Sequence, residues 1–180
     1  MRMICALVMG SVLTLVAGAE PPAAKPLERG DPAPAFKIKD ATGKIIDLAE
    51  LTAKGPVLVR LTCGCAGCDK ELAYYQKISE AYKAQGLISL YVFREPDEKM
   101  AQYAKDKKLN VLYAVDPKGE SWEVFRTKAM PANFLIDKGG KIAAIATGCE
   151  PNGLIANIVS QKTGQLLGVD PVKVEAGKGK

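Results

Sequence analysis

The stretch TCGCAGC, from Thr62 to Cys68, constrains the fold of this 180-residue chain more than any other feature. The apolar run VLVRL directly before it is typical of a buried strand. In residues 69–84, directly after it, apolar side chains recur every three or four positions, which predicts an amphipathic helix. A Cys-x-x-Cys pair, Cys65 and Cys68, is therefore predicted at the point where a buried strand passes into a helix.

The rest of the chain alternates between strand and helix patterns. A turn at residues 40–43, flanked by alternating apolar and polar residues, predicts an N-terminal β-hairpin. Further strands are expected at 87–93, 110–116, 133–137 and 142–148, and helices or helical turns at 48–53, 97–107, 121–127 and 152–162. This order predicts an α/β fold in which helices flank a mixed central sheet, with the hairpin as an extension.

The N-terminal residues carry the features of a secretory signal peptide. An early Arg2 precedes an apolar run, and small residues follow it where a leader peptidase would cleave. The run is shorter than the roughly 20 residues that cross a bilayer, so we expect no stable membrane anchor and a periplasmic or secreted protein. The expected organisation is a signal peptide at 1–19, a Pro-rich linker at 20–34, one domain at 35–165 and a flexible basic tail at 166–180.

Charge and composition exclude several classes of function. The formal net charge of +5 is spread along the chain as mixed lysine and glutamate, which argues against binding to nucleic acid. The sequence contains no histidine, so Cys–His and Ser–His nucleophiles and histidine-ligated metals are excluded. Chemistry must be carried by sulfur, carboxylate, lysine or tyrosine. No pattern in the sequence specifies an oligomeric state.

The position of the cysteine pair gives each thiol an expected role. Free amide groups and the positive end of the helix dipole stabilise a thiolate at a helix N-terminus, so Cys65 is the expected nucleophile. Cys68, one turn further into the helix, would resolve the mixed disulfide that Cys65 forms with a partner. A permanent disulfide or two packed thiols is the structural alternative, and the order of strand, cysteine pair and helix favours redox chemistry.

Residues 30–148 resemble the thioredoxin-like fold, and specifically the TlpA/ResA-like thiol-disulfide oxidoreductases, which share ancestry with the AhpC/TSA peroxiredoxins. GDPAPAFKIKDATGKIIDLAEL resembles that family's opening, VLVRL with the cysteine pair its active site, and MPANFLIDKGGKIAAIATG its proline loop and final hairpin. The resemblance implies protein substrates and a redox partner, and a site without cofactor or bound metal. It also implies a reductive role in the periplasm, and a cis Pro131 that faces the cysteine pair and shapes the substrate groove.

Two features depart from this resemblance. The family usually has an aromatic residue before the first cysteine, where this chain has Gly64, and Cys63 lies one residue further back. A Cys63–Cys65 or Cys63–Cys68 disulfide is therefore an alternative to Cys65–Cys68. Cys149 follows the last strand, which in the family's fold ends beside the start of the active-site helix. It is expected to be either a small buried hydrophobe or a partner of Cys63, through a second disulfide or a four-sulfur site.

Two other functions remain alternatives to an exported thiol-disulfide oxidoreductase. A peroxiredoxin-like thiol peroxidase is suggested by Thr62 and Cys65, although Leu58 replaces the proline of the peroxidatic pattern. The loop at Met130–Pro131 also takes the place of its activating arginine, for which Arg60 and Arg126 are substitutes.

A metal-binding protein on the same scaffold is the second alternative. Three cysteines in six positions, together with the distant Cys149, supply soft ligands for Cu(I) or Zn²⁺ without any histidine.

Overall fold

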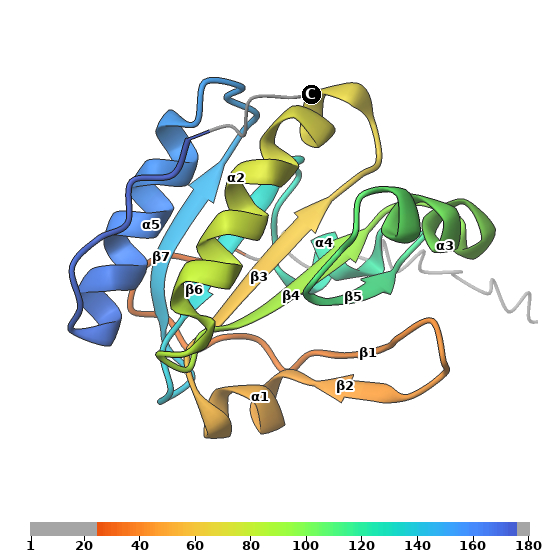
Figure 1. Ribbon diagram of the computed structural model, residues 1–180. Helices are drawn as coiled ribbons and strands as arrows, with labels where there is room; N and C mark the ends of the chain where they lie inside the picture. Colours follow the sequence, from red (N-terminus) through yellow and green to blue (C-terminus); the bar gives the residue numbers. More distant parts are fainter. Residues whose placement is uncertain (1–24, 176–180) are drawn as a thin grey trace, which may run out of the picture.

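The computed structural model describes residues 25–175, which form one sheet with helices on both faces and a separate two-stranded hairpin (Figure 1). In chain order the elements are β1 (Lys37–Lys39), β2 (Ile45–Asp47), α1 (Leu48–Lys54), β3 (Val57–Thr62), α2 (Ala66–Lys83), β4 (Ile88–Phe93), α3 (Asp97–Asp106), β5 (Leu112–Val115), α4 (Glu120–Val124), β6 (Ala132–Ile136), β7 (Ile142–Thr147) and α5 (Leu154–Leu167).

The central sheet is mixed, as the sequence predicts. Its strand order is β5-β4-β3-β6-β7, in which β3, β4 and β5 run parallel and β6 and β7 pair antiparallel. The separate hairpin of β1 and β2 is the predicted N-terminal extension. The strand β3, which leads into the cysteine cluster, lies at the centre of the sheet and is buried along its whole length.

Successive side chains of β3 point to opposite faces of the sheet, and each face has its own core. Val57, Val59 and Leu61 face the hairpin, α1 and α4, whereas Leu58 faces α2 and α5. Figure 1 shows α2 and α5 side by side on this second face. Arg60 lies two positions after Leu58 on β3, so its side chain points to the same face of the sheet, beneath α2.

The helix α2 begins at Ala66, three residues before the predicted start at residue 69. Cys65 is its N-cap, with extended backbone angles, and its carbonyl accepts the first helical hydrogen bond from the Asp69 amide at 2.9 Å. Usual N-cap residues carry an oxygen that bonds the helix amides, and cysteine lacks one. No cap residue therefore marks this start in the sequence. The structure does agree with the position expected for the two cysteines, because Cys65 lies at the helix N-terminus and Cys68 in the first turn.

The C-terminal segment after α5 lies against the helices. The helix itself continues to Leu167, two residues beyond the expected domain boundary. The Val172 amide donates to the hydroxyl of Tyr82 at 2.8 Å, the Val174 amide donates to Asn157 Oδ1 at 2.9 Å, and the Val174 side chain is buried. Side chains of α2 and α5 thus take up polar groups that a loose tail would leave to water.

The predicted signal peptide and the first five residues of the predicted linker, 20–24, fall outside the described residues. The rest of the predicted linker is described, and in it the Gly30 amide donates to the Ile142 carbonyl of β7 at 2.8 Å. Between residues 25 and 175, none of the helices has the length and hydropathy needed to cross a bilayer.

Candidate active site

Three strand ends bring the predicted site residues to one edge of the sheet. In the registers, Leu61 on β3 pairs with Ala132 on β6, which in turn pairs with Thr147 on β7. Cys63 after β3, Pro131 before β6 and Cys149 after β7 are therefore neighbours at this edge. The amide of Gly148 donates to the Pro131 carbonyl at 3.0 Å, and the Met130–Pro131 peptide is cis, as the resemblance implies.

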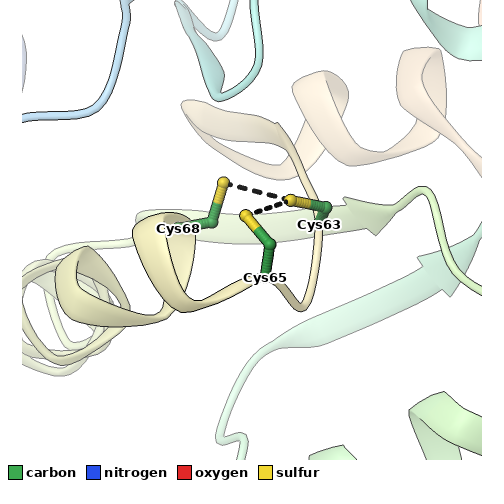
Figure 2. A group of neighbouring side chains, drawn as sticks. All are labelled: Cys63, Cys65 and Cys68. Carbon is green, nitrogen blue, oxygen red and sulfur yellow. Dashed lines mark hydrogen bonds between the residues drawn. The ribbon is translucent and has the colours of Figure 1, made fainter.

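Three thiols form a compact cluster at the start of α2. The Sγ atom of Cys63 lies 2.8 Å from that of Cys65 and 3.3 Å from that of Cys68, and all three sulfurs lie within 4.8 Å of one another. Figure 2 shows the sulfur of Cys63 joined by a dashed line to each of the other two. Cys65 is exposed, Cys63 is partly buried and Cys68 is buried. The outermost thiol of the predicted pair is therefore the one open to a partner protein.

The surroundings favour a thiolate at Cys65. The Cys63 thiol donates a hydrogen bond to Cys65, and this bond is the main cause of a lowered Cys65 pKa. The backbone amides of Cys68 and Gly67, at the N-terminus of α2, lower the pKa of Cys65 further. Burial, with the bond to Cys65 second, raises the pKa of Cys63 to about 12, so Cys63 stays protonated and acts as the donor.

Cys149 lies beside the cluster without joining it. Its Sγ–H donates to the Gly67 carbonyl at 3.1 Å, and a side chain at Gly67 would come within 3.7 Å of the Cys149 sulfur and 4.0 Å of the Cys65 sulfur. The thiol is exposed, so the prediction of a small buried hydrophobe is wrong. Partial desolvation of the sulfur, followed by the nearby Glu71 charge, raises the pKa of Cys149, which favours the thiol form.

Side chains from α3 and the loop before it hold the cysteine turn. The Gly64 amide donates to Glu95 Oε1 at 3.1 Å, and Lys99 pairs with the other oxygen of Glu95 at 2.7 Å. On the first turn of α2, Asp69 accepts from the Tyr103 hydroxyl at 2.8 Å and pairs with Lys107 at 2.7 Å. The Gly64 amide thus has a hydrogen-bond acceptor, and the cysteine turn is held on one side through Glu95 and on the other through Asp69.

A buried ion pair beneath the cysteines was not predicted. Arg60 Nη2 lies 3.0 Å from Glu71 Oε2, and both side chains are 1% exposed. Arg60 also donates to Asn133 Oδ1 at 2.9 Å and lies 3.9 Å over the Tyr75 ring, while Glu71 Oε1 accepts from the Glu150 amide at 2.9 Å. An arginine within an apolar run was the only signal in the sequence.

The same network bears on the peroxidase alternative. Arg60 was one of the two substitutes for an activating arginine. Its guanidinium donates hydrogen bonds to Glu71 and Asn133 on the face of the sheet that α2 covers. Arg126, the other substitute, is exposed and lines a cleft of about 880 Å³ beside Ala129. Arg60 is therefore committed to structure and is not free to activate a peroxide.

That cleft borders the proline loop and is rich in basic side chains. Its lining includes the aromatic Trp122, whose indole nitrogen donates to the Ala129 carbonyl at 2.9 Å and so holds the residue just before Met130. The basic residues that line it are Arg94, Lys118, Arg126 and Lys128. The cleft is thus bordered by the segment that leads into the proline loop and carries four cationic side chains.

The arrangement of the thiols supports disulfide exchange. An exposed thiolate at Cys65 can attack a disulfide of another protein, and a second thiol within 4.8 Å can then displace that protein from the mixed disulfide. Cys68 and Cys63 are both within that reach. No histidine, cofactor or metal is needed for these steps.

Comparisons with known proteins agree with this chemistry. Residues 29–145 match the AhpC/TSA family. The thiol-disulfide oxidoreductase ResA of Bacillus thuringiensis subsp. konkukian is 33% identical over 117 residues, covering 64% of this chain and 68% of that protein. A thiol:disulfide interchange protein DsbE from Chlorobium tepidum has a similar structure, with a TM-score of 0.71, 25% identity, and coverage of 78% and 99%.

A more distant structural neighbour shares the fold alone. The peroxidoxin BcpB from Mycobacterium tuberculosis has a TM-score of 0.64 at 18% identity, covering 80% of this chain and 99% of that one. The predicted thioredoxin-like fold, with its mixed sheet, flanking helices and N-terminal hairpin, is confirmed. The chain therefore belongs to the AhpC/TSA family, among its ResA-type thiol-disulfide oxidoreductases.

Proposed function

We propose that this oxidoreductase is exported and reduces disulfides of other proteins, with Cys65 as the attacking thiolate and Cys68 as the resolving thiol. One observation carries the assignment: Cys65 is exposed at the N-terminus of α2 with a lowered pKa, and Cys68 is buried one turn later. A nucleophile must meet its substrate, whereas a resolving thiol is needed only after the mixed disulfide has formed.

Pro131 is proposed to shape the substrate groove next to the pair. Its place beside Cys63 follows from the strand registers, and its carbonyl is fixed by the Gly148 amide. A substrate segment that passes along this edge would meet the basic cleft on its way to the exposed thiol.

Single cysteine variants test the assignment of roles. Cys65→Ser is expected to abolish reduction of a small disulfide-bonded protein such as insulin, because no exposed low-pKa thiolate remains. The double variant Cys63→Ser/Cys68→Ser is expected to trap the substrate as a mixed disulfide on Cys65, visible by mass spectrometry, because both thiols within reach of Cys65 are removed. Trapping in Cys68→Ser alone, but not in Cys63→Ser alone, would assign the resolving role to Cys68. Cys149→Ser is the matched control, since that thiol is exposed but outside the three-thiol cluster. Activity that survives in Cys65→Ser would refute the nucleophile.

The reductive direction rests on the resemblance to TlpA/ResA-like proteins and is tested by the redox potential. Equilibration with glutathione buffers, followed by alkylation and mass spectrometry, gives the midpoint of the Cys65–Cys68 couple. Thioredoxin has a potential of about −270 mV, and a value in this range would support a reductant. A value of about −120 mV, as in the strong oxidant DsbA, would indicate an oxidant. Turnover of hydrogen peroxide faster than disulfide exchange would favour the peroxidase instead.

Export is proposed from the signal peptide at residues 1–19. The mature protein isolated from the periplasm or the medium is expected to begin at Glu20, as read by mass spectrometry of its N-terminal peptide. Recovery of the chain only with its leader intact, in the membrane fraction, would contradict cleavage and indicate an anchor.

A further inference from the structure

The three-thiol cluster has a property that disulfide exchange does not require. All three of its sulfurs lie within 4.8 Å of one another, close enough to bind one ion together. We propose that the reduced cluster of Cys63, Cys65 and Cys68 binds one cuprous ion in a three-sulfur site. This goes beyond the proposed function, which uses two of these thiols.

The spacing of the sulfurs fits a metal at their centre. A trigonal site with metal–sulfur bonds of about 2.3 Å, the length found for thiolates on zinc, places its sulfurs about 4 Å apart. The observed separations begin at 2.8 and 3.3 Å and none exceeds 4.8 Å. Each sulfur would move by roughly 1 Å or less, which a small rotation about the Cα–Cβ bonds allows. The site is thus nearly formed before a metal arrives.

The donor set favours Cu(I) over harder or four-coordinate ions. Thiolates are soft ligands that select Cu(I) and zinc, and structural zinc almost always takes four protein ligands. Among residues 25–175, the cluster offers three sulfurs and no carboxylate or imidazole within the same reach. Cu(I) is stable with three sulfurs in a plane, so the cluster satisfies it without a fourth ligand.

The surroundings also suit the charge of such a complex. Each bound thiol loses its proton to solvent, so one Cu(I) with three thiolates carries a net charge of −2, with no change in oxidation state. Cys65 is the N-cap of α2, so the free backbone amides and the positive end of the helix dipole lie beside its sulfur and favour negative charge there. A disulfide between any two of these cysteines removes two ligands, so only the reduced protein binds.

The test is a Cu(I) competition on the fully reduced mature protein under anaerobic conditions, with bathocuproine disulfonate as the competing chelator. We expect one Cu(I) per chain for the wild type and for the matched control Cys149→Ser, and at least tenfold weaker binding for Cys63→Ser. X-ray absorption of the wild-type complex should show three sulfur neighbours, independently of any variant. Native mass spectrometry should show one chain per ion.

Several results would overturn the proposal. Equal affinity in Cys63→Ser would reduce the site to the Cys65–Cys68 pair, and lost binding in Cys149→Ser would place the metal elsewhere. Two sulfur neighbours, or one ion shared by two chains, would also contradict it. These readouts use no disulfide substrate, so they fail or succeed independently of the insulin assay that tests the proposed function.

Discussion

Replacing Arg60 by methionine is expected to destabilise the protein strongly, because it breaks the buried ion pair beneath the site. The substitution leaves the Glu71 carboxylate buried, with only the Glu150 amide as a hydrogen-bond donor, and it removes the cation over the Tyr75 ring. It also leaves the Asn133 carbonyl oxygen without its donor.

The magnitude follows from the burial of the pair. Removing one partner of a buried ion pair costs about 3–5 kcal/mol, because the remaining charge is neither solvated nor compensated. Both side chains are 1% exposed, so solvent screening does not reduce this value. Stabilities of about 5–15 kcal/mol are usual for domains, so the loss is a large fraction of the total. At about 2–4 °C per kcal/mol for a chain of this size, Tm should fall by roughly 6–20 °C.

Urea unfolding of the reduced protein measures the change, with the single Trp122 as a fluorescent probe because its side chain is buried. The double variant Arg60→Met/Glu71→Leu is the matched comparison. It removes both charges, and a buried pair replaced by apolar residues is often neutral. It should therefore recover most of the lost stability. A loss below about 1 kcal/mol in Arg60→Met, or a double variant no more stable than the single one, would refute the reasoning.

Two further predictions concern the thiol cluster and the backbone. The lowered pKa keeps Cys65 ionised to lower pH than an ordinary thiol. Its rate of alkylation by iodoacetamide should therefore fall only at pH values below the usual pKa of a thiol. Cys63→Ala removes the donor and should move the midpoint to higher pH, with a smaller shift in Cys63→Ser, and an unmoved midpoint would contradict the assigned hydrogen bond. Gly153→Ala places a Cβ 2.5 Å from the Tyr74 ring at a φ of +82°, whereas Gly86→Ala meets open space at +96°. Thermal unfolding should show a loss of about 1–2 kcal/mol for Gly86→Ala and about 1–3 kcal/mol more for Gly153→Ala, and equal losses would contradict the clash.

The order of elements could be predicted because it is written in local patterns. The apolar run before Thr62 and the periodicity of residues 69–84 each lie within one segment, and together they place Cys65 and Cys68 at a strand–helix junction. The proximity of Cys63 to both was also a local matter, since the three cysteines lie within six positions.

Tertiary partners were beyond such patterns. Arg60 was considered in the sequence only as a substitute for an activating arginine. Its pairing with Glu71 and Asn133 depends on how β3, α2 and β6 pack together. The segment around Val174 has no periodicity, and its burial depends on single side chains of α2 and α5. The position of Cys149 was expected only through the family resemblance, because it depends on how β7 pairs with β6.

The four thiols at one edge of the sheet reach it by very different routes along the chain, which matters while the protein is still unfolded. Cys63, Cys65 and Cys68 are so close in sequence that only short loops need to close for them to come into contact in the unfolded chain. Cys149 follows on the order of eighty residues later, and closing that longer loop costs about 3 kcal/mol more. Bonds among the first three cysteines can therefore form before folding, whereas a bond to Cys149 requires the assembled sheet. A bond to Cys149 in newly made protein would therefore show that oxidation came after folding, whereas bonds among the first three cysteines are compatible with either order.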